Sequence, residues 1–424
     1  MSDERIHARY WVETPATLEE AADIMAGEQS SGTFVKVPGE SDALTERHRA
    51  RVERLTELEP ATAPSLPGAR SPREVHGRPV YARGELELSW PLANLGPSLP
   101  NLLATVAGNL FELQELSGLK LLDLDLPAAF ADAYPGPQFG VVGTRRLTGV
   151  EELALVGTII KPSVGLGPDA TADMARELAA GGIDFIKDDE LQADGPHCPF
   201  EERVAAVMRV LDEHEERTGK KVMYAFNLTG ELDEMLRRHD TVVRHGGSCI
   251  MVSLNSIGLP ALHHLRRLSA LPIHAHRNGW GLFSRDPALG FSYVAWQKLW
   301  RLAGADHMHV NGLRNKFAEP DDSVIASARA CLTPMFDRPG RGCEAMPVFS
   351  SAQWAGQVPD THAALGSSDL IYTCGGGIMG HPGGIGAGIR SIRQAWEAAL
   401  SGRALEDHAR EHRELREALE RFGP

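Results

Sequence analysis

From about residue 150 onward, short apolar runs rich in β-branched residues alternate with longer amphipathic stretches. This alternation is typical of β–α units whose strands form a parallel sheet. The stretches between the apolar runs carry helix signals: Asp169, for example, can cap a helix that Gly181 and Gly182 would end. Eight candidate strands follow one another, at residues 155–162, 183–190, 221–229, 249–255, 272–277, 306–312, 346–352 and 370–376.

The number of these units favours a closed barrel over an open, doubly wound sheet. An open sheet would normally have fewer strands and a glycine-rich fingerprint after the first one, whereas the first strand here leads into KPSVGLG. We therefore predict an α/β fold with a C-terminal (β/α)8 TIM barrel over residues 141–402.

Residues 1–140 mix strand-like and helix-like segments and predict an N-terminal α+β, ferredoxin-like domain. Thr17 and Glu20 form a capping box at the start of its first helix. A charged helical tail, exposed to solvent, is predicted for residues 403–424. Strands of the N-terminal domain are predicted at residues 6–13, 32–37, 79–90 and 119–126, and helices at 17–28, 43–59 and 98–116.

Composition narrows the class of protein. The 424 residues are 42% hydrophobic and 24% charged, enough to bury a large core. The N-terminus has no apolar core of signal-peptide length, and no apolar run approaches the roughly 18 residues of a membrane span, so we expect a cytoplasmic protein. The five cysteines form no CxxC pair and fit reduced thiols. The net charge of −14 disfavours nucleic acid and anionic membranes as partners.

Ionisable side chains recur at the ends of the predicted barrel strands, where the active sites of TIM barrels lie. The first strand ends near Lys161, and the second ends in Lys187, Asp188, Asp189 and Glu190. Because side chains alternate along a strand, Lys187 and Asp189 share one face, Asp188 takes the other, and Glu190 can join the first pair. Two carboxylates and a carbamylated lysine would suit Mg2+. The same residues could equally form a salt-bridge cluster at the barrel rim.

A glycine-rich segment, GGGIMGHPGG, follows the last predicted strand and leads into a predicted helix at residues 385–402. Backbone N–H groups at such a turn can bind phosphate, and the loops after strands seven and eight are the usual phosphate site of these barrels. The alternative is that the glycines only form a turn. Arg277 and His309 could bind a second anionic group from across the barrel.

Taken together, these segments resemble the RuBisCO large-chain superfamily. The segments GTIIKPSVGLG, IDFIKDDE, HAHR, DHMHVNG and GGGIMGHP resemble the family's TIKPKLGL, DFTKDDE, HIHR, DHIHAGT and GGGTLGHP, in the same order and at fitting separations. In the N-terminal domain, GEQSSGTFVKV and TVAGNLFE resemble ESSTGTWTTVW and SIVGNVFG. The resemblance covers nearly the whole chain.

The resemblance implies a role for each matching residue. Lys187 would be carbamylated by CO2 and would bind Mg2+ together with Asp189 and Glu190. Lys161 would be the acid/base lysine of the first strand, and Lys316 the lysine of a mobile loop after strand six. With the polar strand ends, this gives an expected catalytic set of Lys161, Lys187, Lys316, His276 and Asn109.

The resemblance also implies how substrate and subunits are held. Glu28, Thr33 and Asn109 match residues that a neighbouring subunit contributes, which implies a homodimer with a shared active site. Two phosphate-side clusters are expected, one of Arg277, His309 and Ser350, the other of Gly376 and Gly377 with Thr33.

Several positions depart from the carboxylases of the family. Ser163 stands where they have a second lysine, Phe34 and Trp280 replace a tryptophan and a histidine, and a strand-seven SGG has become Ser350, Ser351 and Ala352. The loop after strand six is NGLRNKFAEP where the family has GTVVGKLEGE. We therefore expect a form IV, RuBisCO-like protein rather than an enzyme that fixes CO2 on ribulose bisphosphate.

The retained groups support carbonyl polarisation, proton transfer by lysine and stabilisation of an enediolate. The resemblance favours a Mg2+-dependent lyase that decarboxylates or cleaves 3-oxo-isoapionate 4-phosphate, because Asn109 stands where the related methionine-salvage enolases carry a lysine. The alternatives are an enolase or isomerase acting on a methylthio-ketopentose phosphate, a Schiff-base aldolase using Lys161 or Lys187, and a non-catalytic regulatory member.

Overall fold

The computed structural model describes residues 4–32 and 37–423, which form two compact units. Each unit is discontinuous in the sequence. One comprises Met1–Pro135, Gly279–Leu302 and Met335–Gly342, and the other comprises Gly136–Asn278, Ala303–Pro334 and Cys343–Pro424. The sequence analysis assigned residues 279–302 and 335–342 to the barrel domain, because the alternation of strands and helices runs through them without a break.

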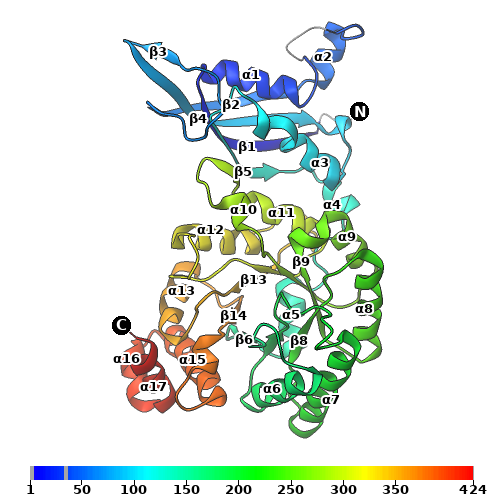
Figure 1. The fold of residues 1–424 in the computed structure, drawn as a ribbon, viewed down its shortest axis with the longest axis vertical. Helices are drawn as coiled ribbons and strands as arrows, with labels where there is room; N and C mark the ends of the chain where they lie inside the picture. The colour runs from blue at the N-terminus through cyan, green and yellow to red at the C-terminus, as the bar shows by residue number, and fades with distance from the viewer. Residues whose placement is uncertain (1–3, 33–36, 424) are drawn as a thin grey trace. The chain divides into compact units, whose positions relative to one another are not determined.

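The first unit is built on a sheet with the strand order β11-β5-β1-β4-β2, to which β3 adds by pairing with β4 (Figure 1). Strand β11 joins this sheet by pairing in parallel with β5, which explains why its segment belongs to this unit. The strands are β1 (Arg5–Thr14), β2 (Arg51–Ala61), β3 (Arg73–Val75), β4 (Arg78–Pro91), β5 (Gly118–Asp125) and β11 (Leu289–Phe291). The helices are α1 (Leu18–Glu28), α2 (Asp42–His48), η1 (Leu92–Asn94), α3 (Leu99–Val106), η2 (Gly108–Glu112), α4 (Ala129–Ala133), α10 (Gly281–Ser284) and α11 (Tyr293–Ala303).

Most of the N-terminal elements are where the sequence predicts them. The capping box is confirmed: the Thr17 side chain accepts from the Glu20 N–H at 3.1 Å, and the Glu20 carboxylate accepts from the Thr17 N–H at 3.0 Å. The helix predicted at residues 43–59 is wrong in its second half, where β2 begins at Arg51 and pairs antiparallel with β4. Ladder hydrogen bonds to β4 outweigh the helix propensity of this charged segment. Most of the strand predicted at 32–37 lies outside the described residues.

The second unit is a closed parallel barrel with helices outside it (Figure 1). All eight predicted strands are present, and the TIM barrel is confirmed. The strands are β6 (Leu155–Ile159), β7 (Phe185–Lys187), β8 (Met223–Asn227), β9 (Cys249–Ser253), β10 (Ile273–His276), β12 (His307–His309), β13 (Met346–Phe349) and β14 (Ile371–Thr373). The helices are α5 (Gly140–Thr148), α6 (Pro168–Ala180), α7 (Phe200–Thr218), α8 (Leu232–Arg244), α9 (Leu254–Leu268), α12 (Asp321–Leu332), η3 (Ala355–Gln357), α13 (Val358–Leu365), α14 (Gly376–Met379), α15 (Ile385–Leu400), α16 (Leu405–Glu411) and α17 (Arg413–Phe422).

Apolar side chains from successive strands fill the barrel interior, so the barrel has a packed core. Phe185 of β7, Met223 of β8 and Met251 of β9 belong to one buried cluster with Val348 of β13 and Ile371 of β14. Because the strands are parallel, their carboxyl ends meet at one rim, and the residues there are brought together.

The C-terminal tail is helical, as predicted, but it is not a single solvated helix. It forms α16 and α17, and α17 buries Leu415 and Ala418. The Glu414 carboxylate accepts from Arg390 at 2.9 Å and from Gln394 at 3.0 Å, which ties α17 to α15.

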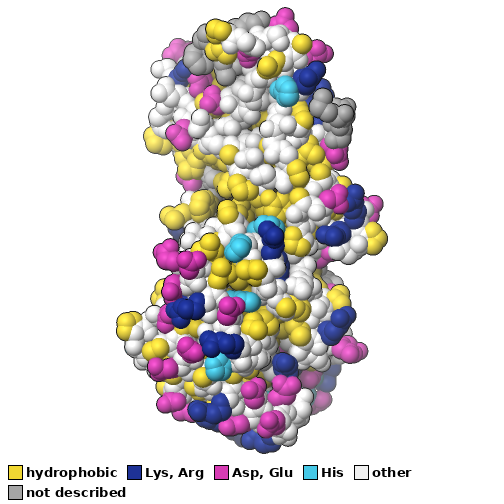
Figure 2. Space-filling view, turned by 90° about the vertical axis from the view of Figure 1, so that its right-hand side faces the viewer, with side chains coloured by type: hydrophobic (Ala, Val, Ile, Leu, Met, Phe, Trp, Pro, Cys, Tyr) yellow, Lys and Arg dark blue, Asp and Glu magenta, His cyan; other side chains and the backbone are white. Residues whose placement is uncertain are grey.

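Within the described part of the chain, no helix combines the length and the hydrophobicity that crossing a membrane requires. Figure 2 shows acidic and basic side chains interspersed over the face that it draws, with no continuous basic area among its coloured residues. Charges of both signs therefore offset one another locally on this face and do not build a field of one sign that would steer a polyanion.

Candidate functional site

A lysine and two carboxylates meet at the carboxyl end of β7. Lys187 is the last residue of the strand and is 1% exposed. Its Nζ lies 3.3 Å from Oε2 of Glu190 and donates to the backbone oxygen of Asp188 at 2.9 Å. Lys161, just beyond β6, places its Nζ 2.6 Å from Oδ2 of Asp189. The structure thus brings together four of the side chains that the strand-end analysis singled out.

The ionisation of this cluster is governed by burial and by neighbouring charges. Burial lowers the pKa of Lys187, although Glu190 and Asp189 act in the opposite direction. Burial opposes ionisation of Glu190, but Lys187 and His276 prevail and lower the pKa of Glu190 to about 2. Burial, reinforced by Lys187, lowers the pKa of His276 to about 4. Near neutral pH, an uncharged imidazole therefore lies beside an ionised Glu190, with 3.4 Å between Nε2 and Oε2.

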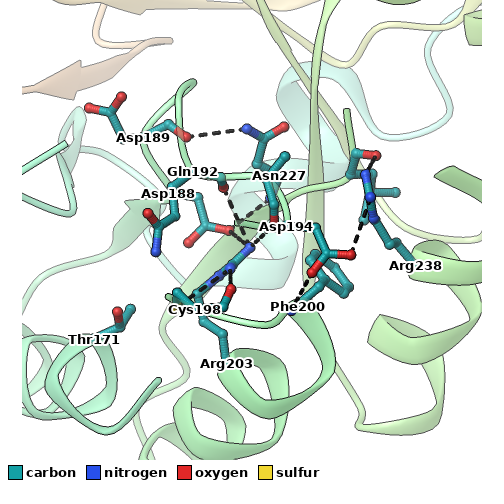
Figure 3. A network of polar contacts seen from close by, with 12 residues as sticks. Thr171, Asp188, Asp189, Gln192, Asp194, Cys198, Phe200, Arg203, Asn227 and Arg238 are labelled. Atoms are coloured by element: carbon teal, nitrogen blue, oxygen red, sulfur yellow. Dashed lines mark hydrogen bonds and ion pairs between the residues drawn. The ribbon is translucent and has the colours of Figure 1, made fainter. Parts of the chain in front are cut away.

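Asp188 faces away from this cluster, as the alternation of side chains predicts (Figure 3). Its carboxylate accepts from the Tyr224 hydroxyl at 2.6 Å, from the Asn227 N–H at 2.9 Å and from Nη2 of Arg203 at 3.2 Å. Asp188, Arg203 and Tyr224 are all fully buried. Of two neighbouring aspartates, Asp189 lies in the candidate site and Asp188 supports the backbone that carries it.

Arg203 extends this support to the loop that follows β7 (Figure 3). Its guanidinium donates to the backbone oxygens of Ala193 at 2.6 Å and of Cys198 at 3.1 Å. Arg203 is not among the site residues predicted from the sequence. A signal was available, because Arg203 lies on the buried face of α7 together with Phe200, Val204 and Val207, and a buried arginine needs a polar partner.

Asn227, the last residue of β8, binds the backbone just after the end of β7 through its side chain. Its side-chain amide donates to the backbone oxygens of Asp189 at 3.2 Å and of Glu190 at 3.3 Å. The backbone that carries both carboxylates is therefore fixed by hydrogen bonds from the neighbouring strand.

The histidines of β10 and β12 form a buried chain beside this cluster. Nε2 of His274 lies 2.7 Å from Nε2 of His309, and Nδ1 of His309 lies 3.2 Å from the Ser350 hydroxyl. Burial lowers the pKa of His274 and of His309 well below the ordinary value, so both rings are neutral near pH 7. His309 and Ser350 are brought together, as the resemblance implied.

Arg277, which follows β10, faces a carboxylate from the loop after β12. Its Nη2 lies 2.5 Å from Oε2 of Glu319, a residue that the sequence analysis did not select. Lys316 is exposed on the same loop, with its Nζ 5.2 Å from the ring centre of Phe317.

The glycine-rich segment after β14 forms the short helix α14, whose first residues are Gly376 and Gly377. A Cβ at Gly377 would lie 2.5 Å from the backbone oxygen of Gln353 and 2.8 Å from Cβ of Trp354, so this position requires glycine. A Cβ at Gly376 would meet nothing within 4 Å. The backbone at Gly376 is therefore open to a ligand, as a phosphate cradle requires.

In the other unit, Glu28 ends α1 and Asn109 lies in η2. The Asn109 side-chain amide donates to Oε1 of Glu28 at 3.3 Å, so two residues predicted to act together are in contact. Thr33 and Phe34 lie outside the described residues.

The fit of the β7 cluster to Mg2+ depends on Lys187. Across residues 4–32 and 37–423, no group of three or more His, Cys, Asp and Glu side chains is arranged to hold a metal ion. Asp189 and Glu190 supply two carboxylates, and Mg2+ prefers anionic oxygen ligands and keeps several waters. A carbamate on Lys187, whose Nζ is already 3.3 Å from Glu190, would supply the third anionic ligand. With that modification the donor set would offer three anionic oxygen ligands to Mg2+, and without it two.

Known proteins match along nearly the whole chain. The family model described as ribulose bisphosphate carboxylase large chain, catalytic domain, matches residues 140–422, and the corresponding N-terminal domain model matches residues 4–130. The 3-oxo-isoapionate-4-phosphate transcarboxylase/hydrolase of Xanthobacter autotrophicus is 57% identical over 416 residues, which cover 98% of this chain and 99% of that protein. The 3-oxo-isoapionate-4-phosphate decarboxylase of Rhizobium etli is 44% identical over 415 residues, 97% of each chain.

A solved structure agrees with these sequence matches. The crystal structure of a rubisco-like protein from Burkholderia fungorum has a TM-score of 0.92 and 48% sequence identity, and the match covers 99% of this chain and 100% of that one. Both domains, their order and the eight-stranded barrel are thus shared with proteins of one family. The chain belongs to the ribulose bisphosphate carboxylase large-chain family, and the proteins similar to it include a 3-oxo-isoapionate-4-phosphate transcarboxylase/hydrolase, a 3-oxo-isoapionate-4-phosphate decarboxylase and a rubisco-like protein.

Proposed function

We propose that this protein is a Mg2+-dependent, RuBisCO-like enzyme that cleaves 3-oxo-isoapionate 4-phosphate by transcarboxylation and hydrolysis. The observation that carries the proposal is the cluster at the end of β7, where buried Lys187 lies 3.3 Å from Glu190 and Asp189 lies next to Lys161. The two relatives described above are both named for this substrate. The transcarboxylase/hydrolase is 57% identical and the decarboxylase 44%, so we favour the former reaction.

The metal ligands would be Asp189, Glu190 and the carbamate of Lys187. Lys187 suits this modification, because burial lowers its pKa and a neutral amine is the form that reacts with CO2. When bound, Mg2+ supplies Lewis-acid stabilisation of the charge that develops on the substrate's carbonyl oxygen.

Lys161 is the acid/base group in this proposal. Its Nζ is held 2.6 Å from Asp189 and donates to the Ser163 hydroxyl at 2.8 Å. Its side chain is 42% exposed, in contrast to Lys187, so it can reach a bound substrate and move a proton at the carbon next to the carbonyl. The neutral ring of His276, whose Nε2 lies 3.4 Å from Oε2 of Glu190, carries one N–H proton close to the same oxygens. Lys316 on the exposed loop would exclude water when the loop covers the substrate.

The phosphate of the substrate would bind at the glycine-rich turn. Gly377 must be glycine for packing, and the open backbone at Gly376 leaves room for the phosphate oxygens. Glu28, Thr33 and Asn109 of a second copy of the chain would complete the site in a homodimer. Mixing a Lys187→Met variant with an Asn109→Ala variant tests this arrangement, because a shared site restores up to about a quarter of the activity in mixed dimers and a self-contained site restores none.

The reaction is tested by product analysis of the purified protein with 3-oxo-isoapionate 4-phosphate, with and without preincubation in Mg2+ and bicarbonate. Phosphoglycerate and glycolate without CO2 release, dependent on Mg2+, support the proposal. CO2 release with a single phosphorylated product assigns the decarboxylase reaction instead. Activity that survives chelation and is trapped by borohydride contradicts the metal site and supports a Schiff-base enzyme.

A further inference from the structure

The loop between β12 and α12 places a partly buried carboxylate against the buried guanidinium of Arg277. The Glu319 side chain is 13% exposed and the Arg277 side chain 7%, with 2.5 Å between Oε2 and Nη2. Asn311 also donates to Oε2 of Glu319, at 2.7 Å, and the Ser323 hydroxyl donates to Oε1 at 3.1 Å. Both carboxylate oxygens therefore have partners, and the ion pair is part of a built polar network.

This pair occupies one end of the site. Arg277, His309 and Ser350 follow or end the neighbouring strands β10, β12 and β13, at the rim where the catalytic cluster also lies. An arginine fork binds carboxylate and phosphate oxygens equally well, and here a carboxylate of the protein is already within hydrogen-bonding distance. Since His309 is neutral, the charges of Arg277 and Glu319 sum to zero at this end.

The sequence offers a reason why this end differs from that of other family members. When the loop NGLRNKFAEP is aligned with GTVVGKLEGE on its lysine, Lys316, Glu319 falls on a glycine. A glycine at this position cannot neutralise an arginine. The family segment has glutamates on either side of that glycine, so this chain carries its loop carboxylate at a different position, the one that faces Arg277.

We propose that Glu319 determines specificity by making the Arg277 end of the site reject a phosphate group and accept an uncharged polar group. A phosphate dianion there would have to approach the partly buried Glu319 carboxylate, and like charges brought together where little water screens them repel. Neutral polar groups lie beside the pair: the Asn311 amide donates to Glu319, and the Ser351 hydroxyl donates to the Asn311 side chain at 3.0 Å. The substrate then carries one phosphate, at the Gly376 end, and a hydroxyl-bearing end at Arg277. This inference rests on the proposed function, in which the substrate is a monophosphate.

The test compares two sugars that differ in one phosphate, ribulose 1,5-bisphosphate and ribulose 5-phosphate, by isothermal titration calorimetry. Calorimetry needs no turnover, so its result stands even if the proposed reaction fails. The wild-type protein should bind the bisphosphate no more tightly than the monophosphate. Glu319→Gln, which keeps the shape and removes the charge, should raise the preference for the bisphosphate by at least about tenfold. Failure of the glutamine variant to bind the bisphosphate more tightly overturns the proposal.

Two further variants separate specificity from general effects. Asp360→Asn is the matched control, because Asp360 pairs with Arg314 of the same loop at 2.6 Å but is 60% exposed, and it should leave the preference unchanged. The double variant Arg277→Met with Glu319→Met removes both charges and avoids a buried unpaired ion. It should bind ribulose 5-phosphate within about threefold of wild type. A loss of monophosphate binding beyond that in a folded double variant would show that Arg277 binds the phosphate, and the proposal would be wrong.

Discussion

Substituting Arg203 with methionine is expected to destabilise the barrel and, at the same time, to weaken Mg2+ binding by the proposed ligands at the end of β7. Arg203 and Asp188 are both fully buried, and Nη2 lies 3.2 Å from Oδ2. Methionine keeps much of the volume of the side chain but carries no charge, so Asp188 loses its counterion. The carboxylate keeps the hydrogen bonds from the Tyr224 hydroxyl at 2.6 Å and from the Asn227 N–H at 2.9 Å.

The contacts that Asp188 loses and keeps determine the expected loss in the free energy of unfolding. Removing one partner of a buried ion pair costs about 3–5 kcal/mol in the free energy of unfolding. The two hydrogen bonds that Asp188 retains favour the lower end of that range, about 3 kcal/mol. For a barrel of this size, the loss corresponds to a decrease in Tm of roughly 6–12 °C. The loop after Glu190 also loses the bonds from Arg203 to Ala193 and Cys198.

Two measurements separate stability from function. Scanning calorimetry gives the Tm, and a titration with Mg2+ in the presence of bicarbonate, followed by the metal-induced rise in Tm, gives the half-saturating Mg2+ concentration. Under the proposed function, this concentration should rise about 10- to 100-fold, because residues that orient metal ligands typically contribute that much to metal affinity.

The barrel contains a matched control in a second buried arginine–aspartate pair. Nη1 of Arg266 lies 2.9 Å from Oδ2 of Asp306, which immediately precedes β12 and so lies at the end of the strand opposite the site. Asp306 keeps three hydrogen bonds from backbone N–H groups, so Arg266→Met should lower the Tm by a similar or smaller amount. Its half-saturating Mg2+ concentration should not change. Equal shifts in both variants, or no shift with Arg203→Met, would refute the idea that Arg203 positions the metal ligands.

Three other outcomes follow from single contacts. Gly377→Ala should abolish phosphate-dependent binding or fold poorly, because its Cβ would lie 2.5 Å from a backbone oxygen. Gly376→Ala has open space around its Cβ, so it should fold normally and lose affinity only for phosphorylated ligands. The Tm measures folding, and calorimetry gives the Kd for the ligands. Tyr224→Phe loses the hydrogen bond to Asp188, so it should lower the free energy of unfolding by about 1.5–3 kcal/mol and raise the half-saturating Mg2+ concentration. Tyr10→Phe is the control, because it loses an equally buried hydrogen bond of 2.6 Å to a backbone oxygen in the other unit, and it should change stability alone. The pKa of Glu190 in the folded state, about 2, is below its value in the unfolded chain. Ionised Glu190 therefore stabilises the fold above roughly pH 4.3, and this stabilisation is lost as the pH falls toward 2. Glu190→Gln should flatten that part of the curve of Tm against pH.

The barrel could be predicted from the sequence because its signals are local. Each strand is a short apolar run between helix signals, and eight such runs allow few arrangements other than a closed barrel. The N-terminal errors concern pairings between distant segments. Strand β2 is exposed over most of its length and shows no apolar face, so only its partner β4 makes it a strand. Strand β11 belongs to the first unit for the same reason, through its pairing with β5.

In the candidate site, too, contacts set by regular strand geometry could be predicted, and contacts set by loop conformation could not. Strand alternation and a common rim were enough to predict that Lys161, Lys187, Asp189 and Glu190 meet, because both follow from regular geometry. Loop conformation determines the partner of Arg277, and no periodicity in the segment 310–320 indicates where the Glu319 carboxylate lies. The resemblance gave Arg277 a role in phosphate binding, but it could not show which group of the protein competes for it.

The two arginines illustrate why family membership leaves the substrate open. Arg203 is buried behind the metal-ligand candidates and donates to Asp188 and to the backbone of the following loop, so its contacts support the cluster whatever the substrate is. Under the proposed function Arg277 lies at one end of the substrate site, and its charge is offset by Glu319, from a loop that differs from the family sequence. Changing one loop residue alters the net charge beside Arg277 and leaves unchanged the β7 cluster that we propose activates the carbonyl. Divergence of substrates within the family can therefore proceed through the loops while the strand ends keep the same chemistry.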